Sequence, residues 1–436
     1  MNIVSIIILV SAFVVTHVAN AFGIFELGPF LAKVNPLWPL YQYLTGVRHK
    51  KFKHLHQKYG DIVRIGINEL SVCNVEALEA IYGHGSHFLK TASYRAIPNE
   101  LKYSTVFSET DPIVHNMLKK QLASAFSTKA LDSMQVYIRA NINTFCDCIR
   151  KFGKNGELAL IMVCPALLPL HYLSPKHIKE AHMQLINQST EMINERIENK
   201  SDRNDFFYYL SDSERLKKAP QDFRDRLVST CVVLIVAGGE TTSIVLNGAI
   251  YLLAAHNNVY EKLHRELTER FPDPKCEIEH HKLADLPYLN AVIDESMRLH
   301  PPIVGPLPRV SSQETVVAAQ KIPPHCIVSV APYAISRDPR YFTKPENFIP
   351  ERWIDSGFER DQTLGKLVFQ PFSLGPRRCL GRNMAYIEIR LFLANFVLQF
   401  RPELEDPKYH YGVQDRVLSF KPSVMVKCRP LKEDSA

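Results

Sequence analysis

The sequence predicts a mainly α-helical protein with a smaller β part, forming one large domain behind an apolar amino-terminal segment. The first observation is helical periodicity, which runs from about residue 76 to about residue 284. The second is that strand-like stretches rich in Val and Ile are confined to residues 61–72 and 303–335. The third is a hydrophobic fraction of 46% over 436 residues, which is ample for a large core.

The composition excludes several classes of protein. With 18 Gly, 28 Pro and 22% charged residues, the chain is neither disordered, nor collagen-like, nor a coiled coil. The net charge of +7 is spread along the chain, so it predicts no nucleic-acid partner, whereas a weakly basic body suits an anionic membrane surface. Nine Cys without a Cys-x-x-Cys pair argue against a zinc ribbon or a disulfide framework and indicate a reducing compartment.

Residues 1–25 are expected to form a transmembrane anchor, and residues 26–436 the folded domain. No charged side chain occurs in residues 2–25, and a helix needs about 20 apolar residues to cross a bilayer. The basic residues that follow place the domain in the cytosol by the positive-inside rule. A cleaved signal peptide is the alternative, because Ala19-Asn20-Ala21 resembles a cleavage site, but a basic n-region is missing.

The first half of the domain begins with a connector and a basic helix over residues 26–60. Residues 61–72 alternate apolar and polar side chains, as expected of a short strand pair. Helices dominate from there on, and the longest is expected over Phe223–His256. The run Ala237-Gly238-Gly239 is expected to interrupt that helix.

In the second half, proline residues mark the ends of elements. Pro287 begins a helix, since proline is favoured in the first turn, and Pro301-Pro302 ends it. Residues 303–335 are strand-like, and residues 384–400 are helical again.

One cysteine stands in an unusual place, within Phe-Ser-Leu-Gly-Pro-Arg-Arg-Cys-Leu-Gly over residues 372–381. Neighbouring guanidinium groups lower the pKa of a thiol, and the amides of a following helix act in the same direction. Gly375 and Gly381 permit tight turns and close approach of the backbone to a flat group. A thiolate presented in this way is a good axial ligand for haem iron. The alternative is that Cys379 is a buried structural cysteine beside a surface arginine pair.

The pattern Phe-x-x-Gly-x-Arg-x-Cys-x-Gly resembles the haem-binding signature of the cytochrome P450 family at every fixed position. The resemblance implies a P450-like domain that binds haem b. It implies that Cys379 is the proximal iron ligand and that Arg377 binds a haem carboxylate. Phe372, Gly375 and Gly381 then belong to the loop that holds the haem.

Three other residues resemble a structural network of the same family. Glu295 and Arg298 are three positions apart on a helix and can pair, although such pairs are common on surfaces and contribute only a few tenths of a kcal/mol. The resemblance identifies them with the Glu-x-x-Arg motif, and Arg352 with the Pro-Glu-Arg segment that completes the trio. Glu388 matches the continuation of the cysteine motif into the next helix.

The glycine pair of the longest helix also admits two interpretations. Each glycine costs about 1 kcal/mol of helix stability relative to alanine, so the pair indicates either a flexible patch or a close approach. Ala237-Gly-Gly-Glu-Thr241 resembles the oxygen-activation motif of the P450 family. The resemblance implies that Thr241 hydrogen-bonds dioxygen or its water and that Glu240 belongs to a proton-delivery path. It also implies that Ala237 and Gly238 face the haem and leave room for the substrate.

Weaker matches concern the haem carboxylates. Residues 115–127 resemble the third long helix of the family, with His115 and Lys119 in place of the usual Trp and Arg. A lysine makes a point-charge contact rather than the forked contact of arginine, and the alternative for Lys119 is a solvated helix face. Arg309, in Pro306-Leu-Pro-Arg309, resembles another carboxylate-binding arginine of the family.

Two departures from the family pattern stand out. From Ser127 to Ala237 there are 110 positions, fewer than the family usually has, and helices that roof the substrate pocket are not recognisable there. The chain is therefore either a compact variant or lacks an exon. In addition, the glycines expected in a strand turn between Ser311 and Ala319 are absent.

The resemblance implies a haem-thiolate monooxygenase that hydroxylates or epoxidises an apolar small molecule with O2. Electrons would come from NADPH through a cytochrome reductase, and the enzyme would be anchored in the endoplasmic reticulum membrane. A role in fungal secondary metabolism is expected by analogy. Two alternatives remain. One is a peroxide-rearranging enzyme of the same fold, and the other is a non-catalytic or unstable haem-binding remnant.

Overall fold

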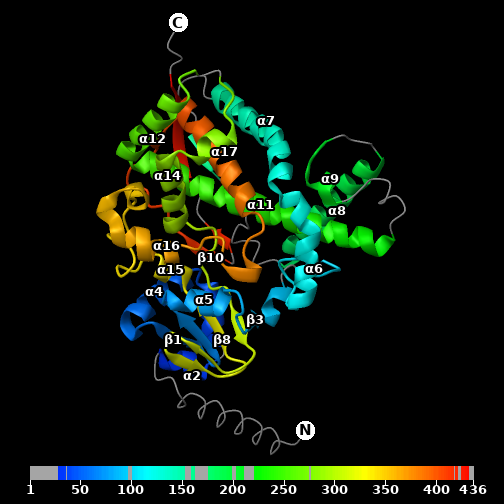
Figure 1. The fold of residues 1–436 in the computed structure, drawn as a ribbon, viewed down its shortest axis with the longest axis vertical. Coiled ribbons are helices and arrows are strands. Elements are labelled where there is room, and N and C mark those ends of the chain that lie inside the picture. The colour runs from blue at the N-terminus through cyan, green and yellow to red at the C-terminus, as the bar shows by residue number, and fades with distance from the viewer. Residues whose placement is uncertain are drawn as a thin grey trace, which may run out of the picture.

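A computed structural model of the chain describes residues 28–35, 37–96, 101–152, 159–162, 175–198, 203–210, 220–273, 276–416, 418–420 and 424–431. The expected anchor over residues 1–25 lies outside the described residues. Within them, helices form the larger part and strands the smaller one, so the predicted fold class is confirmed (Figure 1).

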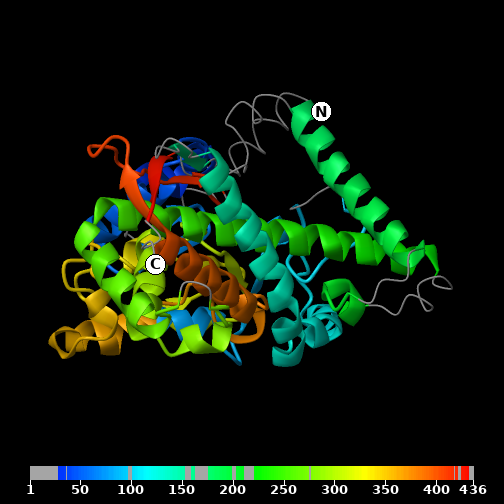
Figure 2. The same cartoon turned by 90° about the horizontal axis from the view of Figure 1, so that it is seen from above.

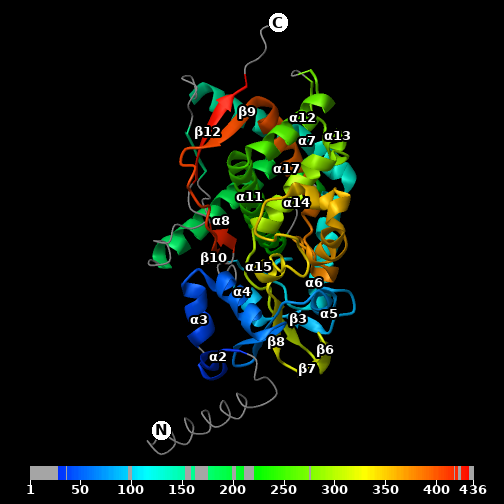
Figure 3. The same ribbon diagram turned by 90° about the vertical axis from the view of Figure 1, so that its left-hand side faces the viewer.

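The main sheet lies at one end of the molecule, together with the first helices of the chain (Figure 3). Its strand order is β1-β2-β8-β5-β3. The predicted strand pair is confirmed as β1 (Ile62–Gly66) antiparallel to β2 (Glu69–Val72), and β2 runs parallel to β8 (Ile327–Val330). At the other edge, β5 (Arg309–Ser311) pairs antiparallel with β3 (Phe88–Lys90).

Helix α11 (Gln221–Ala255) runs through the helical part and contacts α14 (Pro287–Leu299), α17 (Arg382–Gln399) and β9 (Phe400–Leu404). The expected interruption at Ala237 is wrong, because the helix is continuous over 35 residues. Its carboxyl-terminal half is buried from Ile244 to Ile250 with few exceptions, and that packing outweighs the low helix propensity of the glycine pair. Helix α8 (Pro175–Glu198) contacts α11 and reaches out to one side (Figure 2).

The other elements complete the two parts. They are α2 (Phe30–Val34), α3 (Leu37–Leu44), α4 (Arg48–Tyr59), α5 (Glu76–Tyr82), α6 (Pro112–Ala123), α7 (Thr128–Phe152), β4 (Ala159–Met162), α9 (Phe206–Leu210), α12 (Asn257–Arg270), α13 (His280–Ala284), β6 (Thr315–Val317), β7 (Gln320–Ile322), α15 (Pro332–Ile335), α16 (Lys366–Val368), β10 (Gln414–Arg416), β11 (Leu418–Phe420) and β12 (Val424–Pro430). Pro287 begins α14, and the helix ends before Pro301, as predicted.

Each part has its own apolar core. The larger core joins α7, α11, α12, α14 and α17, and the smaller one lies between the main sheet, α5 and α15. Among the described residues, α11 is the one helix long and apolar enough to cross a membrane. Because it packs against α14, α17 and β9, its apolar character also fits a core helix.

The turn between β6 and β7 explains how the chain manages without the expected glycines. Ala318 and Ala319 adopt positive φ angles of 46° and 60°. This left-handed conformation costs an L-residue roughly 1–2 kcal/mol, and the pairing of β6 with β7 holds it in place.

Candidate active site

Cys379 lies between a short 3₁₀ turn over Gly375–Arg377 and the start of α17 at Arg382. Its amide donates a hydrogen bond to the carbonyl of Phe372 at 2.8 Å, which closes the loop, and the residue is exposed. Surrounding protein still desolvates the sulfur and raises the pKa of the Cys379 thiol. The amides of Gly381 and Arg382 act against that rise, as expected for the start of a helix.

The expectation that the flanking arginines lower the pKa of the Cys379 thiol is wrong. Arg377 directs its guanidinium away, donating to the carbonyls of Glu109 at 2.8 Å and Thr110 at 3.1 Å. The neighbouring Arg378 is exposed. The groups that favour a thiolate here are therefore the backbone amides of Gly381 and Arg382. The guanidinium of Arg377 instead holds the cysteine loop to the carbonyls of Glu109 and Thr110.

The two glycines of the loop differ in what they permit. Gly375 has a φ of +62°, and a Cβ added there would lie 2.2 Å from the carbonyl oxygen of Tyr82. Gly381 has a φ of −80°, and a Cβ there would lie 3.9 Å from the sulfur of Cys379, an ordinary contact. Both glycines lie in tight bends of the chain, but only Gly375 requires glycine, because the backbone of the turn at Gly381 is one that other residues also adopt. Phe372 packs its ring on Tyr386 of α17, with centroids 5.3 Å apart.

The glycine pair of α11 faces open space. Ala237, Gly238 and Gly239 are exposed although the helix continues into the core, and a Cβ added to either glycine would meet nothing within 4 Å. Thr241 donates its hydroxyl proton to the carbonyl of Ala237 at 2.6 Å, so the lone pairs of its oxygen are available to other donors. This turn of the helix has room for a flat group.

One turn of α11 is tied to α17 by a hydrogen bond between side chains. Thr242 donates to Glu388 at 3.2 Å, and burial raises the pKa of Glu388 to about 7. The resemblance to the family had singled out Glu388, but the sequence could not show its neutral-range pKa, because that value depends on burial against α11.

Five basic side chains meet beside the cysteine loop, and we name them the basic cluster: Lys90, His115, Lys119, Arg309 and Arg377. They come from β3, α6, β5 and the cysteine loop. Burial, followed by the charges of Arg377, Lys90 and Lys119, lowers the pKa of His115 to about 4. Lys119 donates to the carbonyl of Pro376 at 2.9 Å and so braces the loop.

The basic cluster contains a buried polar atom without a partner. The Nδ1 atom of His115 finds no hydrogen-bond partner among the described residues. Within the same residues, Lys90, Arg309 and Arg377 form no ion pair with a carboxylate at 4.0 Å or less. The sequence analysis missed Lys90. Its alternation with Phe88 could have indicated it, because residues two apart on a strand point to the same face and Phe88 is apolar.

These residues fit a haem. The exposed thiol with two amide donors suits an iron ligand, the open turn at Gly238 suits the porphyrin plane, and the basic cluster suits two carboxylates. Glu240 lies between the open turn and Thr241 on the same helix and is partly exposed.

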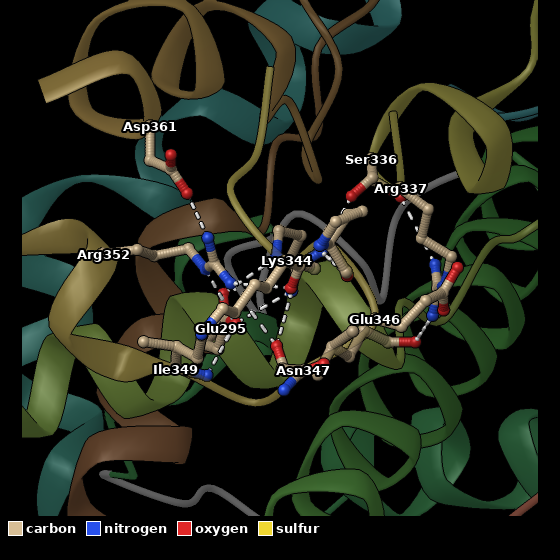
Figure 4. Close-up of polar contacts among 12 residues, drawn as sticks. Glu295, Ser336, Arg337, Lys344, Glu346, Asn347, Ile349, Arg352 and Asp361 are labelled. Atoms are coloured by element: carbon tan, nitrogen blue, oxygen red, sulfur yellow. Dashed lines mark hydrogen bonds and ion pairs between the residues drawn. The ribbon is translucent and has the colours of Figure 1, made fainter. Parts of the chain in front are cut away.

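Glu295 and Arg298 of α14 form a buried ionic network with Arg352 (Figure 4). Glu295 accepts from Arg298 at 2.8 Å and from Arg352 at 2.9 Å, and all three side chains are fully buried. Arg352 also contacts Asp361, so the network holds two positive and two negative charges. The structure therefore brings together the three residues that the sequence grouped, and it adds Asp361.

Comparisons with known proteins bear on the family. The family model for Cytochrome P450 matches residues 139–423, more than half of the chain. The cytochrome P450 monooxygenase poxC of Penicillium oxalicum is 32% identical over 405 residues, which cover 86% of this chain and 82% of that protein. The chain belongs to the cytochrome P450 family. Members of this family contain haem and receive electrons from a redox partner, and this P450 is accordingly an oxidoreductase.

Two further comparisons extend over nearly the whole P450. The fusicoccadiene 8-ol C-16-hydroxylase of Phomopsis amygdali is 29% identical, covering 92% of this chain and 87% of that enzyme. A crystal structure of a cytochrome P450 (CYP102L1) covers 88% of this chain and 94% of its own with a TM-score of 0.74, which at 17% identity shows the fold. The relatives are named monooxygenases, in agreement with the predicted haem-thiolate monooxygenase and with neither alternative.

Proposed function

We propose that Cys379 is the axial ligand of a haem b and that the basic cluster binds the two haem carboxylates. The observation that carries this proposal is the convergence, beside the cysteine loop, of an exposed thiol with amide donors and of basic side chains that form no ion pair with a carboxylate within the described part of the chain. Arg377 links the two features, because it belongs to the cysteine loop and its charge acts on Lys90 and His115.

When bound, the haem would supply the activation of dioxygen. With two electrons and two protons, one oxygen atom of O2 would enter the substrate and the other would be reduced to water. The protein residues bind, orient and move protons. Thr241 orients its oxygen as an acceptor, because its proton is held by the carbonyl of Ala237. Glu240, one residue earlier and partly exposed, is the group we assign to bring protons in from solvent.

The substrate we propose is an apolar small molecule of secondary metabolism. The exposed small residues Ala237 and Gly238 leave room for it, and a relative named for hydroxylating fusicoccadiene 8-ol supports this class. Electrons are proposed to come from NADPH through a flavoprotein reductase. We further propose that residues 1–25 anchor the protein in the endoplasmic reticulum membrane and that the domain over residues 26–436 lies in the cytosol.

The iron ligand is tested on the full chain by the reduced-CO difference spectrum. The wild type is expected to show the absorption typical of thiolate ligation, and Cys379→Ala to lose it. Cys276→Ala is the matched control, because Cys276 is also a free, exposed cysteine, and it should keep the spectrum. A thiolate-type spectrum that survives Cys379→Ala would overturn the assignment.

The proton path is tested by measuring how much product and how much hydrogen peroxide form for each reducing equivalent that is consumed. Thr241→Ala is expected to keep the spectrum but to divert reducing equivalents into hydrogen peroxide, because the acceptor hydroxyl is gone. Thr230→Ala is the control, since Thr230 lies on the same helix and makes the same bond to the fourth preceding carbonyl, at 2.9 Å. Normal coupling in Thr241→Ala would remove Thr241 from the path.

A further inference from the structure

A cleft of about 440 Å³ lies between α7, α13, α14 and α17. Figure 3 shows these helices together in the helical part of the molecule. Two long helices begin at the cleft, because Thr128 and Arg382 are the first residues of α7 and α17 and both line it. The amides at the start of a helix favour a negative charge. The backbone therefore makes this cleft suited to an anion.

Two arginines of α17 bring positive charge to the cleft. Arg382 and Arg390 line it, and their guanidinium carbon atoms lie 5.9 Å and 4.9 Å from the ring centre of Tyr386. Arg390 donates from Nε to the side-chain oxygen of Asn290 at 2.8 Å. Within the described residues, neither arginine forms an ion pair, and the terminal nitrogens of both have no hydrogen-bond partner. The cleft therefore holds two guanidinium groups that can donate to a ligand.

The carboxylates that line the cleft are bonded to other groups. Asp294 accepts from the hydroxyl of Tyr386 at 2.9 Å, and Asp132 accepts from the amide of Gln135 at 3.0 Å. In the part of the chain that the structure describes, neither carboxylate pairs with an arginine at 4.0 Å or less. These carboxylates act on the guanidinium groups only from a distance, so the arginine donors stay open.

His280 adds a further polar group at the cleft. Its Nδ1 atom is buried and has no hydrogen-bond partner among the described residues. Burial, followed by the charge of Arg390, lowers the pKa of His280, so the ring is neutral at neutral pH. A buried polar atom without a partner costs free energy, and a bound ligand with its water can recover that cost.

We propose that this cleft binds the phosphate group of a small molecule through Arg382 and Arg390. The forked donors of arginine match the oxygen atoms and the charge of a phosphate group. A phosphate group alone fills only a small part of about 440 Å³, so the cleft has room for an organic part beside it. The inference does not depend on the haem, because none of the haem-binding or proton-transferring side chains proposed above lines the cleft.

The experiment is isothermal titration calorimetry on holoprotein of the full chain, in a buffer without phosphate. The probes are ribose 5-phosphate and inorganic phosphate, and sodium chloride at matched ionic strength gives the baseline. The variants are Arg382→Gln and Arg390→Gln, with Arg270→Gln as the control. Arg270 is also an exposed arginine beside an aromatic ring, 5.8 Å from the centre of Phe271, but it does not line the cleft.

The wild type is expected to bind ribose 5-phosphate saturably. Arg382→Gln and Arg390→Gln should each weaken binding about ten- to a hundredfold, because a charged hydrogen bond is lost, while Arg270→Gln should bind like the wild type. Tighter binding of ribose 5-phosphate than of inorganic phosphate assigns the cleft to a phosphate ester, and equal affinities assign it to free phosphate.

Two results would overturn the inference. One is the absence of saturable binding of both probes to the wild type. The other is an affinity in Arg382→Gln equal to that in Arg270→Gln. Because the side chain of Arg382 is exposed, this variant keeps the test decisive should Arg390→Gln fail to fold.

Discussion

Replacing Glu295 by Gln removes one negative charge from a buried network whose other members stay. The two carboxylate oxygens of Glu295 accept from Arg298, Arg352, the amide of Ile349 at 3.0 Å and the indole of Trp353 at 3.1 Å. After the substitution, Arg352 keeps the carboxylate of Asp361, while Arg298 keeps only backbone carbonyls as partners besides the neutral amide. Breaking a buried ion pair on one side costs about 3–5 kcal/mol.

The assay is thermal unfolding of the holoprotein followed by circular dichroism. For a chain of this length, a loss of about 3–5 kcal/mol lowers the Tm by roughly 3–5 °C. Glu277→Gln is the matched control, because Glu277 pairs with Arg139 at 2.7 Å and its side chain is 69% exposed. Exposed pairs contribute about 0–1 kcal/mol, so the control should hardly move.

The pH dependence provides a second check on the same variant. Burial alone would raise the pKa of Glu295, but the charges of Arg298 and Arg352 outweigh it and lower the pKa. Its stabilising effect is therefore present at neutral pH and is lost as the pH falls through the lowered pKa. Glu295→Gln should reduce the acid sensitivity of the protein. Equal Tm values for Glu295→Gln and Glu277→Gln would refute the reasoning.

Three further predictions concern stability. Gly375→Ala should lower the free energy of unfolding, measured in urea, by about 3 kcal/mol or more, because of the positive φ and the contact with Tyr82. Gly381→Ala should lower it by no more than about 1 kcal/mol, and equal losses in the two variants would contradict the geometry. Glu388 has a pKa raised from 4.5 to about 7, so the wild type should lose up to about 3 kcal/mol as the pH rises from 4.5 through 7, and unfolding of Glu388→Gln should be free of that slope. Ala319→Gly should raise the free energy of unfolding by about 0.5–1 kcal/mol, since glycine accepts the φ of 60°; a destabilised variant would show that the turn is unstrained.

Local patterns were sufficient for much of the fold and for the family. The helix from Pro287 and the strand pair over residues 61–72 follow from proline placement and from alternation, which act over a few neighbouring residues. The prediction of an interruption at Ala237 was wrong because packing between distant segments, which local patterns do not contain, decides the outcome there. Glycine propensity is a local term of about 1 kcal/mol, and the packing of the rest of α11 exceeds it.

The sequence by itself determined the loop that presents Cys379, because its glycines, its arginine and the helix after it are contiguous in the chain. Only the tertiary structure decided what each residue contacts. Arg377 turns to the carbonyls of Glu109 and Thr110, and Lys90 meets Arg309 from a strand that is more than two hundred positions earlier. Burial and the charges of distant neighbours set the pKa of such groups, and both arise when segments far apart in sequence are packed together.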